Sequence, residues 1–160
     1  MKRKWIESYD VSIAQGLFAA NASLDGLPGF LGAQFAEFGP GRLRIEMPVR
    51  SELLTPFGSL HGGVLAALCD HALGCVCYPH MRRGHWAATT EFKLNYLAPV
   101  RSGTVQVEAQ IVSMTRTTAV VRIDVHNEDR LAAVAQGTVL IREGPAASSE
   151  RAQSEATPGG

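Results

Sequence analysis

A short glycine-containing loop and the apolar run that follows it constrain the fold of this chain more than any other stretch. The sequence from Phe57 to Asp70 reads as a tight loop that leads into a buried helix, with Gly62 and Gly63 at the expected helix start. The first four N–H groups of a helix have no partner inside it, and the positive end of the helix dipole lies at the same place. Such an end suits an anion or a developing oxyanion.

The expected helix carries one carboxylate, Asp70, on the face opposite its apolar stripe. At about 3.6 residues per turn, one side of the helix collects the core residues. These are Leu65, Leu68, Ala72 and Val76. The neighbours of Asp70 at helical spacing are all small: Gly63, Ala66, Ala67, Gly74 and Cys77. This pattern indicates close approach by a ligand or by another element, but a helix-packing face with Asp70 held by a backbone partner explains it equally well.

The length and composition of the chain allow one globular domain with a real core. Its 160 residues are 46% hydrophobic and 19% charged, with a formal net charge of zero and a pI of about 7.0. A neutral chain gives no support for bulk electrostatic binding to nucleic acid or to an anionic membrane. No apolar run reaches the ~18 residues of a membrane span, and no apolar segment follows the basic start, Met1–Lys4. We therefore expect a cytoplasmic protein without nucleic-acid or membrane partners.

The three cysteines do not suggest a metal site, a disulfide framework or a catalytic triad. Cys69, Cys75 and Cys77 are clustered, odd in number and without a zinc-type spacing. We expect them as buried residues in a reducing compartment, and we expect no metal. The chain has no G-x-S-x-G elbow, and Cys69 lies about 100° from Asp70 around the helix. Asp70 and His71 are sequence neighbours and do not face one another, so they do not form a metal pair.

The rest of the sequence predicts an α+β domain. Helical periodicity runs from Trp5 to Ala22 and again from Gly62 to Tyr78, where Pro79 ends it. Alternating apolar residues predict strands at Leu31–Phe38, Arg42–Pro48, Ala87–Leu97, Thr104–Ser113, Thr117–His126 and Arg130–Arg142. The last three strands, joined by short turns, form an antiparallel meander. One antiparallel sheet packed on one buried helix is the economical arrangement.

These elements divide the chain into three parts. Residues 1–30 form an N-terminal helical segment, and Asp25 to Gly29 break its helix. Residues 31–142 form the core domain. Residues 143–160 are rich in Gly, Pro, Ala, Ser and Glu, and we expect this tail to be disordered.

Two stretches together carry a resemblance to a known family. The first is His61-Gly62-Gly63 with an acid nine residues after the histidine, and the second is the strand end from Asn95 to Pro99. Together they resemble hotdog-fold acyl-CoA thioesterases, and more closely the PaaI-like group, which includes one type of 4-hydroxybenzoyl-CoA thioesterase. The resemblance runs from about residue 31 to residue 141. It implies a curved antiparallel sheet wrapped around a long central helix, and a homodimer that often pairs into a tetramer.

The resemblance also implies thioester hydrolysis without a metal or a bound cofactor. By motif, Gly62 would give the backbone N–H that polarises the thioester carbonyl. Asp70 would be the nucleophile or the general base that activates water, and His61 would help to shape the helix start. Relatives often carry Asn or Gln six residues before the histidine, where this chain has Thr55; a hydroxyl can still donate one hydrogen bond.

Further positions match residues that contact substrate in relatives. Two groups would line the coenzyme A channel. One is Tyr96, and the other is the turn after the next expected strand, with Ser113, Arg116 and Thr117. Thr89 and Glu91, on the strand before Tyr96, would border the acyl end. The expected reaction converts an aryl- or medium-chain acyl-CoA to the free acid and coenzyme A. Taken alone, His61 at a helix start is more simply a cap. A non-catalytic acyl-CoA sensor that uses the same pocket remains an alternative. A hotdog hydratase or dehydratase is another, although its usual His–acid arrangement is not evident here.

The spacing of Gly62 and Asp70 indicates that each site needs two chains. The two residues are eight positions apart on one helix, which separates them by about 12 Å along its axis. A base must lie within about 3–3.5 Å of the reacting carbon while the oxyanion donor lies about 3 Å from its oxygen. Two antiparallel copies of the helix around a two-fold axis would satisfy both distances.

Overall fold

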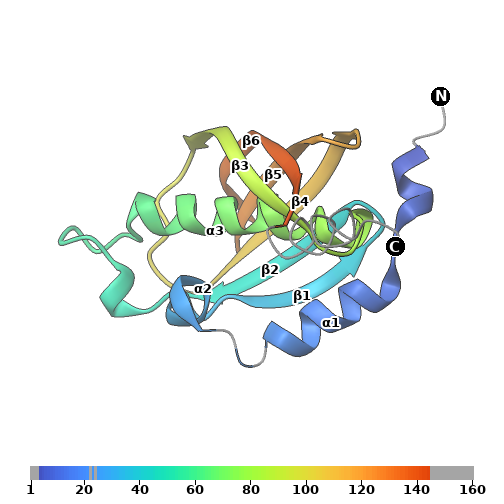
Figure 1. Ribbon diagram of the computed structural model, residues 1–160. Helices are drawn as coiled ribbons and strands as arrows, with labels where there is room; N and C mark the ends of the chain where they lie inside the picture. Colours follow the sequence, from blue (N-terminus) through green and yellow to red (C-terminus); the bar gives the residue numbers. More distant parts are fainter. Residues whose placement is uncertain (1–3, 22, 24, 145–160) are drawn as a thin grey trace, which may run out of the picture.

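The computed structural model describes residues 4–21, 23 and 25–144 of the chain (Figure 1). Six strands form one antiparallel sheet in the order β1-β2-β4-β5-β6-β3. Their bounds are Gln34–Gly39 (β1), Arg42–Pro48 (β2), His85–Tyr96 (β3), Thr104–Met114 (β4), Thr118–Asn127 (β5) and Arg130–Glu143 (β6). The sheet curves around a long helix, α3 (Gly62–Cys75). The predicted hotdog architecture and α+β class are confirmed, and each predicted strand of the second half agrees within two residues. The expected tail lies outside the described residues from position 145 onward.

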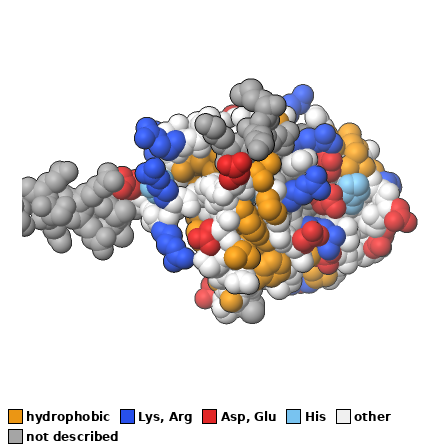
Figure 2. All heavy atoms as spheres, turned by 90° about the vertical axis from the view of Figure 1, so that its right-hand side faces the viewer, with side chains coloured by type: hydrophobic (Ala, Val, Ile, Leu, Met, Phe, Trp, Pro, Cys, Tyr) orange, Lys and Arg blue, Asp and Glu red, His pale blue; other side chains and the backbone are white. Residues whose placement is uncertain are grey.

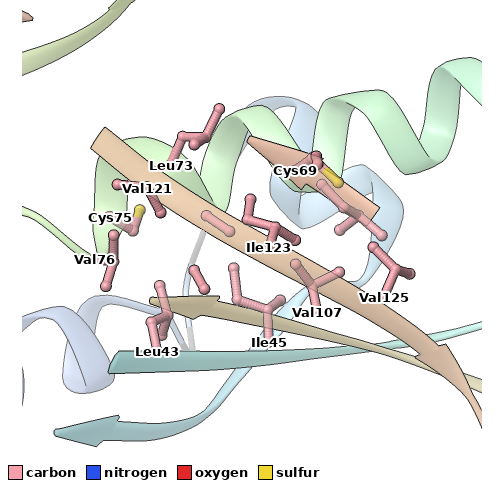
Figure 3. Packing of buried hydrophobic residues seen from close by; sticks show 14 of the residues in the cluster. Leu43, Ile45, Cys69, Leu73, Cys75, Val76, Val107, Val121, Ile123 and Val125 are labelled. Atoms are coloured by element: carbon pink, nitrogen blue, oxygen red, sulfur yellow. The ribbon is translucent and has the colours of Figure 1, made fainter. Parts of the chain in front are cut away.

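The core lies between α3 and the concave face of the sheet. All four residues of the predicted apolar stripe of α3 are buried. In β2 the buried side chains of Leu43, Ile45 and Met47 alternate with polar ones, so only one strand face enters the core. Figure 3 shows Leu43 and Ile45 pointing from the sheet toward the helix that carries Leu73. Fully burying each large aliphatic side chain contributes roughly 1.5–3 kcal/mol, so this two-layer core fixes the position of α3.

The N-terminal region differs from the single helix that periodicity predicted. It forms a 3₁₀ helix, η1 (Lys4–Ser8), and a separate helix, α1 (Val11–Asn21). Asp10 separates them, because its Oδ1 accepts hydrogen bonds from the backbone N–H of Ser12 at 2.8 Å and from the Ser12 hydroxyl at 2.6 Å. A side chain that satisfies N–H groups in this way starts a new helix.

The expected break between Asp25 and Gly29 is instead a short helix, α2 (Gly26–Leu31). Proline is tolerated in the first turn of a helix, which explains how Pro28 fits here. Gly32 ends α2 in a left-handed conformation with φ of 75°. The predicted strand start at Leu31 is therefore wrong, and β1 begins at Gln34.

The central helix ends three residues earlier than predicted. The chain leaves α3 after Cys75, and Tyr78–His80 form a 3₁₀ helix, η3, that contains Pro79. Within the described residues, the stretch Gly62–His80 is long and apolar enough to cross a membrane by length and composition alone, with a mean hydropathy of 1.2. Its position under the curved sheet is that of a core helix.

His80 connects three separate parts of the chain. Its Nε2 accepts the backbone N–H of Gly41 at 2.8 Å, and its Nδ1 lies 2.8 Å from the carbonyl oxygen of Trp5. The ring also contacts the rings of Trp5 and Tyr9, with centroids 5.4 Å away in each case. One nitrogen that donates and one that accepts require a neutral imidazole. Burial lowers the pKa of His80, although the Trp5 hydrogen bond opposes part of this effect.

We expect acid to destabilise the fold through His80. An unfolded histidine binds a proton near pH ~6.5, whereas folded His80 binds one only at lower pH. Its contribution to the free energy of unfolding is therefore fully present above about pH 6.5 and is lost as the pH falls toward the folded pKa. Urea denaturation between about pH 8 and pH 5 measures this loss. The variant His80→Gln keeps a donor and an acceptor without titrating, and it should lose less stability over the same range; an equal loss in both proteins would contradict the assignment.

Candidate active site

The start of α3 is shaped by His61. This residue is the N-cap of the helix, with φ of −64° and ψ of 131°, and its Nδ1 accepts the backbone N–H of Gly63 at 2.9 Å. The backbone N–H of His61 donates to the carbonyl of Leu53 at 3.0 Å, which fixes the approach of the chain. Within the described part of the chain, the N–H of Gly62 donates no hydrogen bond. A donor at the positive end of the helix is therefore free to bind a carbonyl or an oxyanion.

Tyr96 lies directly over the same helix start. Its hydroxyl donates to the carbonyl oxygen of Gly62 at 2.8 Å, and its side chain is half exposed. A Cβ atom added at Gly62 would lie 3.0 Å from that hydroxyl oxygen. The close approach of Tyr96 explains why glycine suits position 62.

The loop before the helix holds Thr55 in a tight turn. The N–H of Thr55 donates to Ser59 O at 2.7 Å, and the N–H of Gly58 donates to Thr55 O at 2.9 Å. The hydroxyl oxygens of Thr55 and Ser59 are 3.3 Å apart. At the tip of the loop, Phe57 is 88% exposed, and its carbonyl lies 3.4 Å from the guanidinium of Arg101. Backbone bonds within the loop thus fix the position of the half-buried Thr55.

Asp70 is exposed and lies at a pocket that the sequence did not reveal. The pocket has a volume of about 180 Å³. Its lining comes from α2 and α3: Leu27, Pro28, Leu31, Ala67, Leu68, Asp70 and His71. The part of the pocket from α2 was missed because its Gly and Pro residues read as a break. The small residue Ala67, predicted on the face of Asp70, opens space beside the carboxylate.

His71 forms a second polar group in this pocket. Its ring stacks on Phe35 at 5.7 Å between centroids, with the planes 5° apart. Both ring nitrogens lie 3.7 Å from the Sγ of Cys75. Burial lowers the pKa of His71, and the nearby charge of Asp70 offsets only part of this shift. His71 is therefore largely neutral near pH 7.

The cysteines are not nucleophiles. All three are free and buried, as predicted. Burial raises the pKa of each thiol to about 12; the charge of Asp70 adds to this effect at Cys69, and Cys75 adds to it at Cys77. A thiol that stays protonated at neutral pH cannot attack a carbonyl. In the part of the chain that the structure describes, no group of three potential metal ligands is close enough to hold an ion.

The remaining predicted substrate residues lie at two ends of the sheet. Tyr96 pairs with Ala133, at the start of β6, whereas Thr118 pairs with Leu140, near its end. Seven residues of strand separate the two places by about 23 Å. The turn residues Ser113, Arg116 and Thr117 are exposed beside the far end of β6, while Thr89 and Glu91 flank an irregularity in the middle of β3. One chain alone therefore does not bring Tyr96 and the turn together.

Comparison with known proteins shows which family this chain is similar to. Residues 57–134 match the model of the thioesterase superfamily. The proofreading thioesterase EntH of Klebsiella pneumoniae is 32% identical over 113 residues, which cover 70% of this chain and 82% of EntH. The crystal structure of thioesterase HI1161 from Haemophilus influenzae is similar with a TM-score of 0.74 at 28% identity, over 81% of this chain and 90% of HI1161.

A structure of the phenylacetic acid degradation protein PaaI from Thermus thermophilus is also similar. Its TM-score is 0.66 at 29% identity, over 72% of this chain and 98% of PaaI. The resemblance drawn from the sequence is thereby confirmed. The chain belongs to the thioesterase superfamily and is a hotdog-fold thioester hydrolase of the PaaI-like group.

Proposed function

We propose that this chain hydrolyses an arylacyl-CoA thioester to the free acid and coenzyme A, in a site shared by two copies of the chain. The pocket beside Asp70 carries the proposal. Its walls are mostly apolar, with Leu27, Leu31 and Leu68 on them and the carboxylate of Asp70 at the same place. An acyl group seated there would present its carbonyl carbon to that carboxylate.

The size of the pocket suits one aromatic ring. An apolar cavity of about 150 Å³ in another protein takes up one benzene molecule, and the pocket here measures about 180 Å³. One aromatic ring with a short link to the thioester therefore fits this space. The name of the PaaI relative, which refers to phenylacetic acid degradation, supports the same class of acyl group.

A second copy would complete the chemistry. Gly62 begins α3 and Asp70 lies eight residues along it, so about 12 Å of helix separates the free N–H from the carboxylate. In an antiparallel pair of α3 helices, the N–H of Gly62 would lie beside the partner's Asp70. The same two-fold axis would carry Tyr96 toward the β4–β5 turn of the other copy, which explains why one chain keeps these residues about 23 Å apart.

The strand β3 supports the dimer. It is an edge strand of twelve residues, paired on one side with β6. A long edge with unpaired backbone groups tends to bind another strand. We propose β3 as the dimer contact. The outer sheet face would join two dimers, because Arg42 and Arg122 lie there close to Glu108 and Asp124; opposite charges in adjacent rows suit contact with a second copy.

The reaction would follow from these positions. Asp70 would remove a proton from water, and the hydroxide would attack the thioester carbon, or the carboxylate would attack it directly. The N–H of Gly62 would stabilise the oxyanion. The C–S bond would then break, and coenzyme A would leave as a thiolate that takes up a proton. If the carboxylate attacks directly, water would then hydrolyse the anhydride formed between Asp70 and the acyl group, which releases the free acid and restores the carboxylate. No metal or bound cofactor is required for these steps.

No nucleic-acid or membrane partner enters this proposal. Figure 2 shows one face of the molecule, where a band of hydrophobic side chains has both basic and acidic side chains on either side. Mixed charges of this kind do not form the single-sign patch that binds nucleic acid. The free buried thiols suit the reducing cytoplasm that we propose as the location.

A free-thiol release assay tests the proposed function. The panel contains benzoyl-CoA, phenylacetyl-CoA, hydroxybenzoyl-CoA and octanoyl-CoA. We expect kcat/KM for the preferred aryl thioester to exceed that for octanoyl-CoA by at least about 10-fold, the discrimination that a pocket of fixed size supplies. A preference for octanoyl-CoA would contradict the aryl assignment. Tight binding without thiol release would indicate a sensor, and hydration of an enoyl-CoA would indicate a hydratase.

We expect Thr55→Val to slow the reaction. If the hydroxyl holds the carbonyl or the attacking water, its loss should cost about 1–3 kcal/mol of transition-state stabilisation. Thr55→Asn and Thr55→Gln should keep or raise activity, because an amide donates the same bond. Ser59→Ala removes the hydroxyl that lies 3.3 Å from the Thr55 hydroxyl but leaves Thr55 itself in place, so it should lower kcat/KM less than Thr55→Val does. Unchanged kcat/KM in Thr55→Val would exclude this position from the site.

A further inference from the structure

We propose that His71 is a specificity-determining residue that hydrogen-bonds a hydroxyl group on the aromatic ring of the acyl substrate. This inference rests on the proposed function, because it concerns the same pocket. It extends that proposal from a ring of suitable size to a ring that carries a polar substituent. Three features of His71 support it: its place in the pocket, its fixed ring and its poorly satisfied nitrogens.

His71 and Asp70 are the two polar groups among the residues that line the pocket. Adjacent residues on a helix point about 100° apart. The two side chains therefore belong to different parts of the wall, with apolar Leu68 and Ala67 also contributing. A substrate whose carbonyl lies at Asp70 can then reach His71 with another part of its acyl group.

The ring of His71 is held by aromatic contacts on the side of β1. It stacks on Phe35, and Phe35 contacts Phe38 and Phe18 with centroids 5.2 and 6.3 Å away. The parallel stack, with planes 5° apart, restricts rotation of the imidazole. A pre-oriented polar group discriminates between ligands better than a mobile one, because less ordering is needed on binding.

The nitrogens of His71 have little to bond inside the protein. Within the described residues, their contact is the Sγ of Cys75, 3.7 Å from each. A thiol is only a weak hydrogen-bond partner. The imidazole is half buried, so water satisfies it only in part. A ligand hydroxyl fits this position, because it can donate to one imidazole nitrogen or accept from the other.

The chemistry predicts a preference that can be measured. A site that hydrogen-bonds a substrate hydroxyl rejects the analogue without it, because the site's polar group is then left unpaired. We expect the protein to prefer one hydroxybenzoyl-CoA isomer over benzoyl-CoA by at least about 10-fold in kcat/KM. His71→Leu should bring this ratio close to one. His71→Gln, which keeps a donor and an acceptor, should retain part of it.

A matched control and a binding measurement complete the test. His126→Leu changes a half-buried histidine on β5 that does not line the pocket, and it should leave the ratio unchanged. The same ratio is measured as Kd by calorimetry in the Asp70→Asn protein, with and without His71→Leu. This second readout does not depend on turnover. If the protein hydrolyses no aryl thioester, the proposed function is wrong. The ratio of Kd values still tests the role of His71 in that case. A ratio that His71→Leu and His71→Gln both leave unchanged overturns the inference.

Discussion

Replacing Asp70 with Asn is expected to lower kcat by about 10²–10⁴-fold, the usual contribution of a positioned general base, or by more if Asp70 is the nucleophile. The amide has nearly the same shape as the carboxylate, but it neither removes a proton nor attacks a carbonyl. Asp70 is exposed at its pocket, so the change should not disturb the core. The rate of thiol release at saturating concentrations of the preferred acyl-CoA measures this change in kcat.

The control for this prediction is Glu7→Gln. Glu7 is an exposed acid on η1. The substitution makes the same change from carboxylate to amide outside the proposed site and should keep wild-type kcat. Circular dichroism and acyl-CoA binding should be alike in all three proteins. Wild-type turnover in Asp70→Asn would remove Asp70 from the mechanism.

The second large effect is expected from Gly62→Pro. Proline lacks the backbone N–H, and loss of one oxyanion donor typically costs about 10²–10³-fold in kcat. The helix should tolerate this change, because Gly62 is the first residue of α3 and proline is favoured there. The preceding residue, His61, already has the extended ψ of 131° that proline requires before it.

Gly62→Ala separates the lost donor from the added carbon. Its Cβ would lie 3.0 Å from the hydroxyl oxygen of Tyr96, and the proline ring adds a Cβ at the same place. Both variants therefore displace Tyr96, but only proline removes the N–H. We expect kcat of Gly62→Pro to fall at least about 10-fold below that of Gly62→Ala. Equal kcat in the two variants would show that the N–H of Gly62 does not stabilise the oxyanion.

The regular parts of this fold were predictable because each has one dominant period. Strict alternation identified β2 and the three strands of the meander, and the apolar stripe identified α3. The sequence failed where local polar contacts decide the structure. Asp10 starts a new helix through its bonds to Ser12, and the Gly-Pro sequence of α2 reads as a turn. Periodicity averages over such positions and does not detect them.

Only part of the candidate site could be predicted from local sequence patterns. The helix start and Asp70 could be proposed from the sequence because one motif and one helix contain them. The α2 wall of the pocket was not, because contacts between α2 and α3 join residues about 40 positions apart and no local pattern records them. The pairing of β3 with β6 is also a long-range contact. It makes β3 an edge strand, which the order of strands in the sequence does not reveal.

Subunit complementation tests the shared site most directly. Asp70→Asn chains and Gly62→Pro chains are each expected to be nearly inactive, yet a hybrid dimer contains one site with both defects and one site with neither. The two chains carry distinct affinity tags, are mixed and refolded, and the hybrid dimers are then separated. Each hybrid dimer should regain up to about half of the wild-type activity. Hybrids that stay as inactive as the parents, while both parents bind acyl-CoA normally, would contradict a site built from two chains, as would an active monomer.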